Sequence, residues 1–294
     1  MKSGVKRTTP YKVISIIILV ILAILFLFPL YWIVTGAFKP TTDIYASKPV
    51  WWPSEWVTSN FEKLFTKRSA PLFEIGSLVG PTVPAAIRWL VNTVFMSVAA
   101  MILTCITATM AGYALAKKRF VGRTLLFSLI ICAMALPKQV ILIPLLKEMS
   151  ALNLYNTLWA VIFPTVGWPF GVFLMKQFCE SVPGEMLEAA RIDGASEART
   201  FTQIVVPLVK PGIGALAIFT FINSWNDYFM QLIMLANNNN FTISLGIATL
   251  QGESSVDTGL LMAGAALASV PIIIVFLIFQ KYFTQGITMG AVKG

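Results

Sequence analysis

The sequence of 294 residues contains no histidine, and only 12% of its residues are charged. Soluble domains usually carry about 25% charged residues, so this chain has roughly half of the charge that a water-covered surface needs. The lack of histidine excludes histidine metal ligands and a histidine general base. These two absences argue against a soluble enzyme and against a nucleic-acid-binding domain.

Cysteine is also scarce. Only Cys105, Cys132 and Cys179 are present, far apart in the sequence, and the first two lie inside apolar runs. Three scattered cysteines do not make the disulfide framework of a small secreted domain, and such residues are typical of small buried apolar side chains. We therefore expect no metal site and no cofactor in this chain.

What the sequence has in abundance is apolar surface. Hydrophobic residues make up 57% of it, and the mean hydropathy is +0.78. Several uninterrupted apolar runs are long enough to cross about 30 Å of hydrocarbon as helices. The composition therefore predicts an all-α, polytopic membrane protein. The net charge of +9 fits the excess of Lys and Arg in cytoplasmic loops and needs no nucleic acid partner.

The apolar runs predict six transmembrane helices, at about residues 13–38, 89–116, 124–146, 158–178, 213–236 and 259–282. The first run is about twice the length of the apolar region of a signal peptide, so we expect a retained anchor. Proline inside the third run (Pro137, Pro144) and inside the fourth (Pro164, Pro169) predicts helices that are kinked or broken.

Three regions follow from this count. Residues 1–38 form an N-terminal tail and the first helix, residues 39–86 form an outer (periplasmic or extracellular) loop, and residues 87–294 form a core of five helices. The core includes a polar loop at 179–211 and a C-terminal tail at 283–294. Lys and Arg are more frequent beside the N-terminus and in the loops that share its side, which predicts that both ends are cytoplasmic.

The polar loop at 179–211 has clear helix signals. Pro183 suits the first turn of a helix, Gly194 is a natural stop, and a second short helix can run from Ala195 to Val205 before Pro207. The loop therefore predicts a helix–turn–helix on the cytoplasmic face. Spacing alone leaves two roles open for Glu188, which can pair with Arg191 on its own helix or face a partner protein.

The same loop carries a motif. Glu188-Ala189-Ala190, then Gly194, Ile204 and Pro207, resembles the EAA signature E-A-A-x3-G-x9-I-x-L-P of ABC importer permeases, with Val206 in place of Leu. The turn at 193–195 is similar to that of the sugar-importing branch, and so are segments 169–171, 224–228 and 280–294. From about residue 89 onward the chain resembles maltose-permease-like proteins, a binding-protein-dependent transport family of the cell inner membrane.

The resemblance implies a type I ABC importer permease that forms half of the translocation pathway for a sugar or oligosaccharide. It implies a second permease subunit in a heterodimer, two ATP-binding subunits at the cytoplasmic face and a solute-binding protein outside. The partner ATPase would bind ATP and Mg, and this chain has no G-x4-G-K-[ST] phosphate loop of its own. The implied ATPase-coupling residues are Glu188, Ala189, Ala190, Asp193, Gly194 and Pro207.

Polar residues inside predicted spans are candidates for the pathway or its gate: Asn223, Asn226, Asp227 and Pro137. A charged Asp in the bilayer is costly unless it faces a bundle interior or a water-filled cavity. Asp227 can equally cap or pair locally, or lie near the outer interface. For Lys138, which follows Pro137, a local structural role and contact with the solute are likewise both open. In the polar outer loop at 237–258, the candidates for contact with the binding protein are Gly252, Glu253 and Ser254.

Two other functions compete with sugar import. The EAA loop is shared by importers of other solutes such as peptides or polyamines, so the solute class depends on the sugar-type turn, segments and tail. A membrane-embedded enzyme would need several ionisable groups at one depth, and only Asp227 and Lys138 qualify. We therefore expect a transport subunit without catalytic residues.

Overall fold

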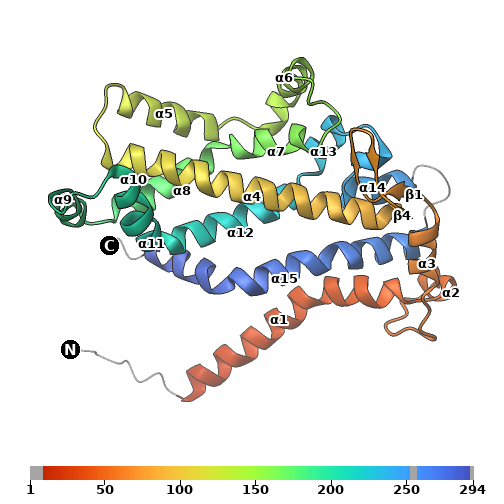
Figure 1. The fold of residues 1–294 in the computed structure, drawn as a ribbon. Helices are drawn as coiled ribbons and strands as arrows, with labels where there is room; N and C mark the ends of the chain where they lie inside the picture. Colours follow the sequence, from red (N-terminus) through yellow and green to blue (C-terminus); the bar gives the residue numbers. More distant parts are fainter. Residues whose placement is uncertain (1–8, 252–256, 292–294) are drawn as a thin grey trace.

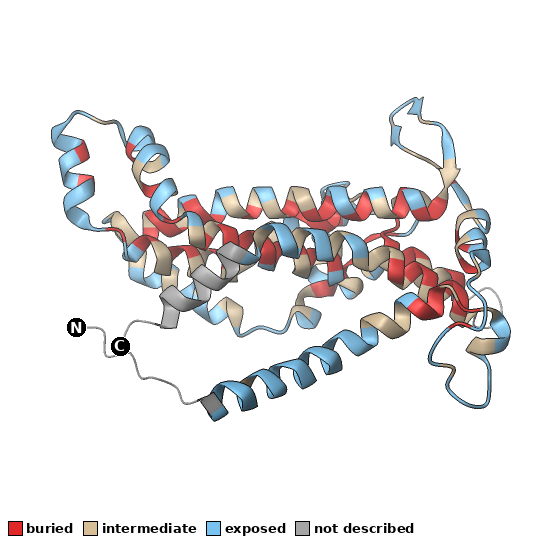
Figure 2. Ribbon diagram, turned by 90° about the horizontal axis from the view of Figure 1, so that it is seen from below, coloured by how far each residue is buried: buried red, intermediate tan, exposed pale blue. Residues whose placement is uncertain are grey.

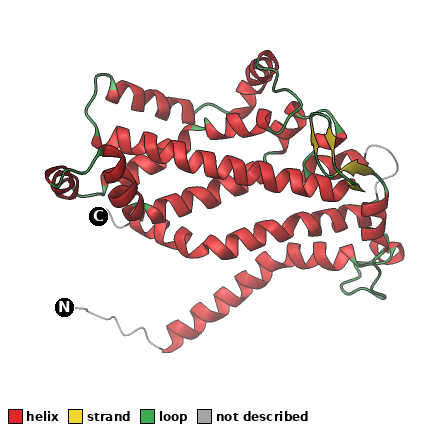
Figure 3. Cartoon of the chain, in the orientation of Figure 1, coloured by secondary structure: helices red, strands yellow, loops and turns green. Residues whose placement is uncertain are grey.

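The computed structural model describes residues 9–251 and 257–291. Most of this part of the chain is helical, and the long helices lie side by side in one bundle (Figure 3). The longest helices are α1 (Thr9–Ala37), α4 (Ala85–Lys117), α12 (Lys210–Asn226) and α15 (Thr258–Ala291). The architecture is all-α, as the composition predicts.

Shorter helices complete the bundle: α5 (Arg123–Met134), α6 (Lys138–Ala151), α7 (Trp159–Val166), α8 (Pro169–Glu180), α13 (Tyr228–Met234) and α14 (Ile243–Gln251). By length and composition four helical stretches can cross a membrane, namely residues 10–37, 85–117, 159–180 and 258–280. Two more spans result if each of two bent helix pairs, α5 with α6 and residues 197–208 with α12, counts as one. The described residues thus hold four to six candidate spans, and the upper count equals the hydropathy prediction, although the second pair contains residues 197–208 in place of the expected stretch after α12.

The third predicted span departs from a straight helix. α5 ends at Met134, and α6 starts at Lys138 at an angle of 107° to it. Pro137 is extended and caps α6, so the break expected there is present. Pro144 does not end α6, which continues to Ala151 instead of stopping near residue 146.

Two other helix ends differ from the prediction. The fifth span is divided, because α12 ends at Asn226, Asp227 has non-helical backbone angles, and α13 starts at Tyr228. The last helix does not stop near residue 282, because α15 remains helical to Ala291. No proline follows Pro271, so nothing in this stretch forces the helix to end.

α4 is the central helix, and it packs against α7, α8 and α12. Its Trp89 lies with Phe221 and Trp225 among the largest fully buried side chains, and buried positions line the inner faces of the helices (Figure 2). At Gly112 an added Cβ would lie 2.7 Å from the backbone nitrogen of Lys176, so only glycine permits this approach of α4 to α8. The first part of α1 is exposed and diverges from the bundle (Figure 2).

The two ends of the bundle carry different structures (Figure 1). At one end, the 38–86 region folds into a cap of short helices and two antiparallel strand pairs, β1 with β4 and β2 with β3: α2 (Thr41–Ile44), α3 (Ser59–Thr66), β1 (Ser69–Pro71), β2 (Glu74–Ile75), β3 (Leu78–Val79) and β4 (Thr82–Pro84). At the other end a helical hairpin projects, and α1 begins and α15 ends on that same side (Figure 1).

Candidate coupling hairpin and helix breaks

The projecting hairpin is built from residues 184–208, and we call it the coupling hairpin. Its first helix, α9 (Gly184–Ile192), follows Pro183 in an extended conformation. It ends at Gly194, whose φ of +75° is accessible to glycine without strain. The amide of Ala195 donates to the carbonyl of Ala190 at 2.9 Å, and the amide of Gly194 donates to Arg191 at 3.0 Å. These two bonds form the glycine-terminated C-cap that the sequence predicts at this position.

The second arm starts at Ser196, whose hydroxyl accepts from the amide of Arg199 at 3.3 Å. The arm consists of α10 (Glu197–Thr200), a π-helical turn η1 (Phe201–Val205) and α11 (Val206–Leu208). The expectation that it stops before Pro207 is wrong, because helical backbone continues to Leu208. Pro207 has no N–H to donate to the preceding turn, and the wider π turn lies directly ahead of it.

One face of the hairpin packs on the bundle. Leu187 and Ala190 of α9 are buried, and Leu187 belongs to an apolar cluster with residues of α4, α8 and α12. The other members of this cluster with Leu187 are Ala108, Tyr113, Met175, Cys179, Val182, Val205, Val209 and Leu216. Leu187 therefore anchors α9 in the same apolar cluster as residues of α4, α8 and α12.

Glu197 adds a polar anchor. Its carboxylate accepts from Tyr113 at 3.3 Å and from Arg191 at 3.4 Å, and it forms an ion pair with Lys118. The hydrogen bond from Lys118 holds the pKa of Glu197 below its ordinary value. At Lys118 burial lowers the pKa, but the bonds to Glu197 and Tyr113 outweigh this effect and raise it overall.

Glu188 has no such partner. It is exposed on α9 and makes no hydrogen bond or ion pair within residues 9–251 and 257–291. The alternative pairing with Arg191 is not formed, because the guanidinium of Arg191 is engaged with Glu197. Beside Glu188 lie exposed Ala189 and Ile192, the latter 86% exposed. This outward face thus carries an unpaired carboxylate beside exposed apolar side chains.

A second cluster lies where helices break. Lys138, the first residue of α6, places Nζ 3.1 Å from Oδ2 of Asp227, between α12 and α13. The same ammonium lies 4.8 Å from the ring centroid of Trp168, which caps α8 after the break from α7. Asp227 also caps α13, since its Oδ1 accepts from the amide of Met230 at 3.4 Å. The local pairing and capping that the sequence left open for Asp227 are both present.

Asn223 and Asn226 lie just before this break, on the exposed side of α12. Their amide groups donate to carbonyls one turn earlier in the helix, of Phe219 at 2.8 Å and of Ile222 at 2.9 Å. Their side-chain oxygens accept no hydrogen bond from the described residues, so both present free acceptors along one helix face.

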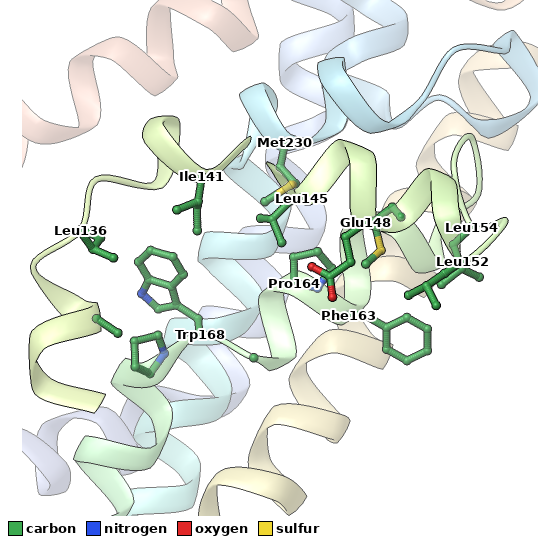
Figure 4. Close-up of a pocket in the computed structure, with 14 residues that line it drawn as sticks. Leu136, Ile141, Leu145, Glu148, Leu152, Leu154, Phe163, Pro164, Trp168 and Met230 are labelled. Atoms are coloured by element: carbon green, nitrogen blue, oxygen red, sulfur yellow. The ribbon is translucent and has the colours of Figure 1, made fainter. Parts of the chain in front are cut away.

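Two cavities meet at Trp168. The larger, about 490 Å³, lies between α6, α7 and α13 and is mostly apolar, with Glu148 as the one charged side chain in its lining (Figure 4). The smaller, about 60 Å³, is lined by Lys138, Asn223 and Trp168 among others. A polar solute would meet hydrogen-bonding groups in the small cavity and few in the large one.

Sequence reasoning missed two of these contacts. The ion pair of Glu197 joins residues 79 positions apart, and its only sequence signal is the pair Lys117-Lys118 at the end of a span. Trp168 beside Lys138 had no signal at all. The binding-protein candidates Gly252, Glu253 and Ser254 lie outside the described residues. No cluster of three metal-binding side chains occurs within the residues that the structure describes.

Comparison with known proteins gives one family and many relatives. A family described as "Binding-protein-dependent transport system inner membrane component" matches residues 106–289. The chain is 34% identical to the arabinooligosaccharides transport system permease protein AraQ of Halalkalibacterium halodurans, over 93% of each chain. It is 32% identical to AraQ of Bacillus subtilis, over 97% of this chain and 96% of that one. It is 29% identical to the trehalose transport system permease protein SugB of Mycobacterium tuberculosis, over 99% and 100%.

Solved structures show the same fold. A bacterial ABC transporter involved in the import of the acidic polysaccharide alginate aligns with a TM-score of 0.75 and 21% identity, over 93% of this chain and 96% of that one. The MetNI methionine ABC transporter aligns with a TM-score of 0.55 and 15% identity, over 69% and 96%. The helix arrangement is thus common to transporters of different solutes.

Proposed function

This chain belongs to the family of binding-protein-dependent transport system inner membrane components, and we propose that it forms half of the pathway by which an ATP-driven importer moves a sugar or oligosaccharide inward. It is a multi-pass membrane protein and a transport subunit, not an enzyme. The observation that carries the proposal is the coupling hairpin, which Leu187 and Glu197 anchor to the bundle and whose outer face carries an unpaired carboxylate.

The hairpin is suited to receive force from a separate ATPase, which binds the ATP and Mg. In this proposal Glu188 pairs with a basic residue of that subunit, and the small side chains of Ala189 and Ala190 allow close approach. Gly194 with Asp193 sets the turn, and Pro207 lies in the last helical turn of the second arm, after the π turn. Because Leu187 lies in one apolar cluster with residues of α4, α8 and α12, a push on α9 would reach the membrane helices through this cluster.

The solute class is supported by the named relatives. Their names assign them to the transport of arabinooligosaccharides and of trehalose, which are saccharides of two or more units. Import of a peptide or polyamine has no comparable support. The likeness to the alginate and methionine transporters bears on the fold alone, since both are below 25% identical.

The partners in the proposal are a second permease subunit, two ATP-binding subunits and a solute-binding protein on the outer face. The coupling hairpin and both ends of the chain are cytoplasmic, and the cap at residues 38–86 is outside. Basic residues at the hairpin end of α4 and α5, Lys117, Lys118 and Arg123, support this orientation. Gly252, Glu253 and Ser254 are the proposed contacts with the binding protein.

The pathway is proposed to run along the exposed side of α12. Asn223 and Asn226 offer amides to sugar hydroxyl groups, Asp227 holds the break between α12 and α13, and Pro137 holds the break before α6. Support comes from the two free amide oxygens and from the ion pair that joins α6 to the α12–α13 break.

Transport by the assembled complex tests the proposal. The chain, its partner permease, the ATPase and the binding protein encoded beside it are reconstituted in proteoliposomes, and ATP-dependent uptake of labelled saccharides, a peptide and spermidine is measured. We expect uptake of at least one saccharide and of neither other solute. Uptake of the peptide or of spermidine alone would overturn the sugar assignment, and uptake without ATP would overturn the importer.

A further inference from the structure

The four consecutive asparagines at 237–240 form a turn at the capped end of the bundle. Their backbone is held by α4: Arg88 and Asn92 each donate to the carbonyl of Asn239 at 2.9 Å, and Trp89 donates to that of Asn238 at 3.0 Å. On the other side, Asn156 accepts from the amide of Asn237 at 2.9 Å. The turn is thereby fixed by its backbone and by the Asn240 side chain, which donates to the carbonyl of Asn156 at 2.5 Å, while the Asn237 side chain and the side-chain oxygen of Asn239 are left for other contacts.

Beside this turn lies the largest cavity described here, about 770 Å³ in volume. Its lining comes from the turn, the first part of α4, the start of α7 and the strand segment at Glu74, and these elements lie at the capped end of the bundle (Figure 1). Its size is within the roughly 300–1,000 Å³ typical of small-molecule sites. We infer that this cavity is a binding site for a neutral saccharide, an inference that rests on the proposed import of sugars.

The walls supply the two kinds of contact that a sugar ring needs. Trp159 and Phe95, in edge-to-face contact at 6.1 Å between centroids, are both partly exposed and provide flat apolar surface for the C–H face of a ring. Asn237 has a side chain without a hydrogen bond in the described part of the chain. Asn239 uses its amino group on Glu74 at 3.0 Å, which leaves its oxygen to accept from a hydroxyl.

Charge decides which saccharide fits. The lining contains one basic residue, Arg88, and one acidic residue, Glu74, so its formal charge is zero. Arg88 already donates to the carbonyls of Leu72 and Asn239, and the carboxylate of Glu74 would repel a uronate or a phosphate. A neutral sugar therefore binds better than an acidic one. The 490 Å³ cavity in the membrane part, with Glu148 alone among apolar side chains, lacks the amides for the same role.

Binding and uptake measurements with paired variants test the inference. The probe is whichever of arabinotriose, trehalose and diacetylchitobiose the wild-type transporter takes up best, with trigalacturonate as the acidic counterpart. Trp159→Ala should weaken calorimetric binding to the full chain in nanodiscs, and raise the KM of uptake, by roughly five- to tenfold. Trp159→Phe should restore most of the binding, and Asn237→Ala should weaken it without loss of folded protein.

Trp56→Ala is the matched control. Trp56 is an exposed tryptophan of the cap at the same end of the bundle, and it does not line the cavity. Equal binding by the Trp159 and Trp56 variants, or equal affinity for trigalacturonate, would overturn the inference. No saccharide uptake by the wild type would mean failure of the proposed function. Normal saccharide uptake that is unaffected by Trp159→Ala and Asn237→Ala would refute this site alone.

Discussion

Lys138 and Asp227 form an ion pair of 3.1 Å across 89 positions of sequence, at the point where two membrane segments are interrupted. Each charge offsets the other, which is how ionisable groups persist in a bundle interior. Asp227 also satisfies a free amide of α13, and Lys138 lies over the indole of Trp168. The pair therefore ties together the breaks before α6, α8 and α13.

The ion pair predicts that removal of one charge destabilises the protein more than removal of both. Asp227→Leu leaves the ammonium of Lys138 without a partner and should destabilise the protein by about 1–3 kcal/mol. Asp227→Asn keeps an oxygen for Lys138 and a cap for α13, so it should preserve assembly while it alters transport. The double variant Lys138→Met with Asp227→Leu should recover stability, as measured by thermal denaturation in detergent. A double variant no better than Asp227→Leu alone would contradict the pairing.

Gly112 makes a prediction for packing. An added methyl group would meet the backbone of Met175 and Lys176 at 2.7 Å, and backbone atoms cannot rotate out of the way. Gly112→Ala should therefore cost about 1–3 kcal/mol of stability. Gly184→Ala is the matched control, because nothing lies within 4 Å of a Cβ there. Thermal denaturation midpoints of the two variants should differ, with that of Gly184→Ala close to wild type.

Local signals in the sequence were sufficient for several features. Apolar runs located the four helical stretches that can cross a membrane, Pro137 located the break before α6, and Gly194 located the end of α9. In each case the cause is a property of the residue itself, such as the missing N–H of proline or the permitted positive φ of glycine. The exact helix ends were less predictable, because Pro144 and Pro207 are accommodated by the surrounding helices.

Long-range pairings could not be predicted in the same way. The sequence marked Lys138 and Asp227 separately, but it carried no information on the 107° turn that brings α6 to the α12–α13 break. The network around Glu197 was missed for the same reason, since its donors come from α4 and α9. Whether Glu188 pairs with Arg191 depended on a competing partner that only the fold supplies.

The predicted orientation in the membrane can be tested by chemical labelling of introduced cysteines. Glu55 lies in the cap and Ala198 in the coupling hairpin, and both are exposed. In a background with the exposed Cys132 replaced by alanine, Glu55→Cys should react with a membrane-impermeant maleimide added to whole cells. Ala198→Cys should react only after the membrane is opened. Reaction of both from the same side would refute the topology.

The stability of the protein is predicted to fall at acidic pH in part through Glu197, which anchors the hairpin. Its pKa is lower in the folded protein than its ordinary value of 4.5, so its stabilising contribution is complete above that value and is lost as pH falls through the lowered pKa. Because this carboxylate is exposed, the contribution should be only about 0.2–1 kcal/mol. Glu197→Gln should remove this part of the loss in stability on acidification, as measured by denaturation midpoints over a pH series.

Glu188 carries the prediction for coupling. Its carboxylate is exposed and unpaired in the described chain, whereas Arg191 is held by Glu197. Loss of one partner from a desolvated, hydrogen-bonded charge pair costs about 2–5 kcal/mol. Glu188→Ala should therefore leave the protein in the membrane but release the ATPase, or separate ATP hydrolysis from uptake.

Two matched variants isolate this effect. Glu185→Ala removes an exposed carboxylate from the first turn of the same helix, and it should retain both the ATPase and uptake. Arg191→Ala breaks only an exposed pair with Glu197, a contact of about 0.2–1 kcal/mol, so it should also be mild. Two measurements distinguish Glu188→Ala from these two variants: copurification of the ATPase, and the ratio of solute uptake to ATP hydrolysis. If Glu188→Ala were as mild as Glu185→Ala in both measurements, the carboxylate of Glu188 would have no part in docking, and the contact with the ATPase would have to rest on the apolar residues of α9.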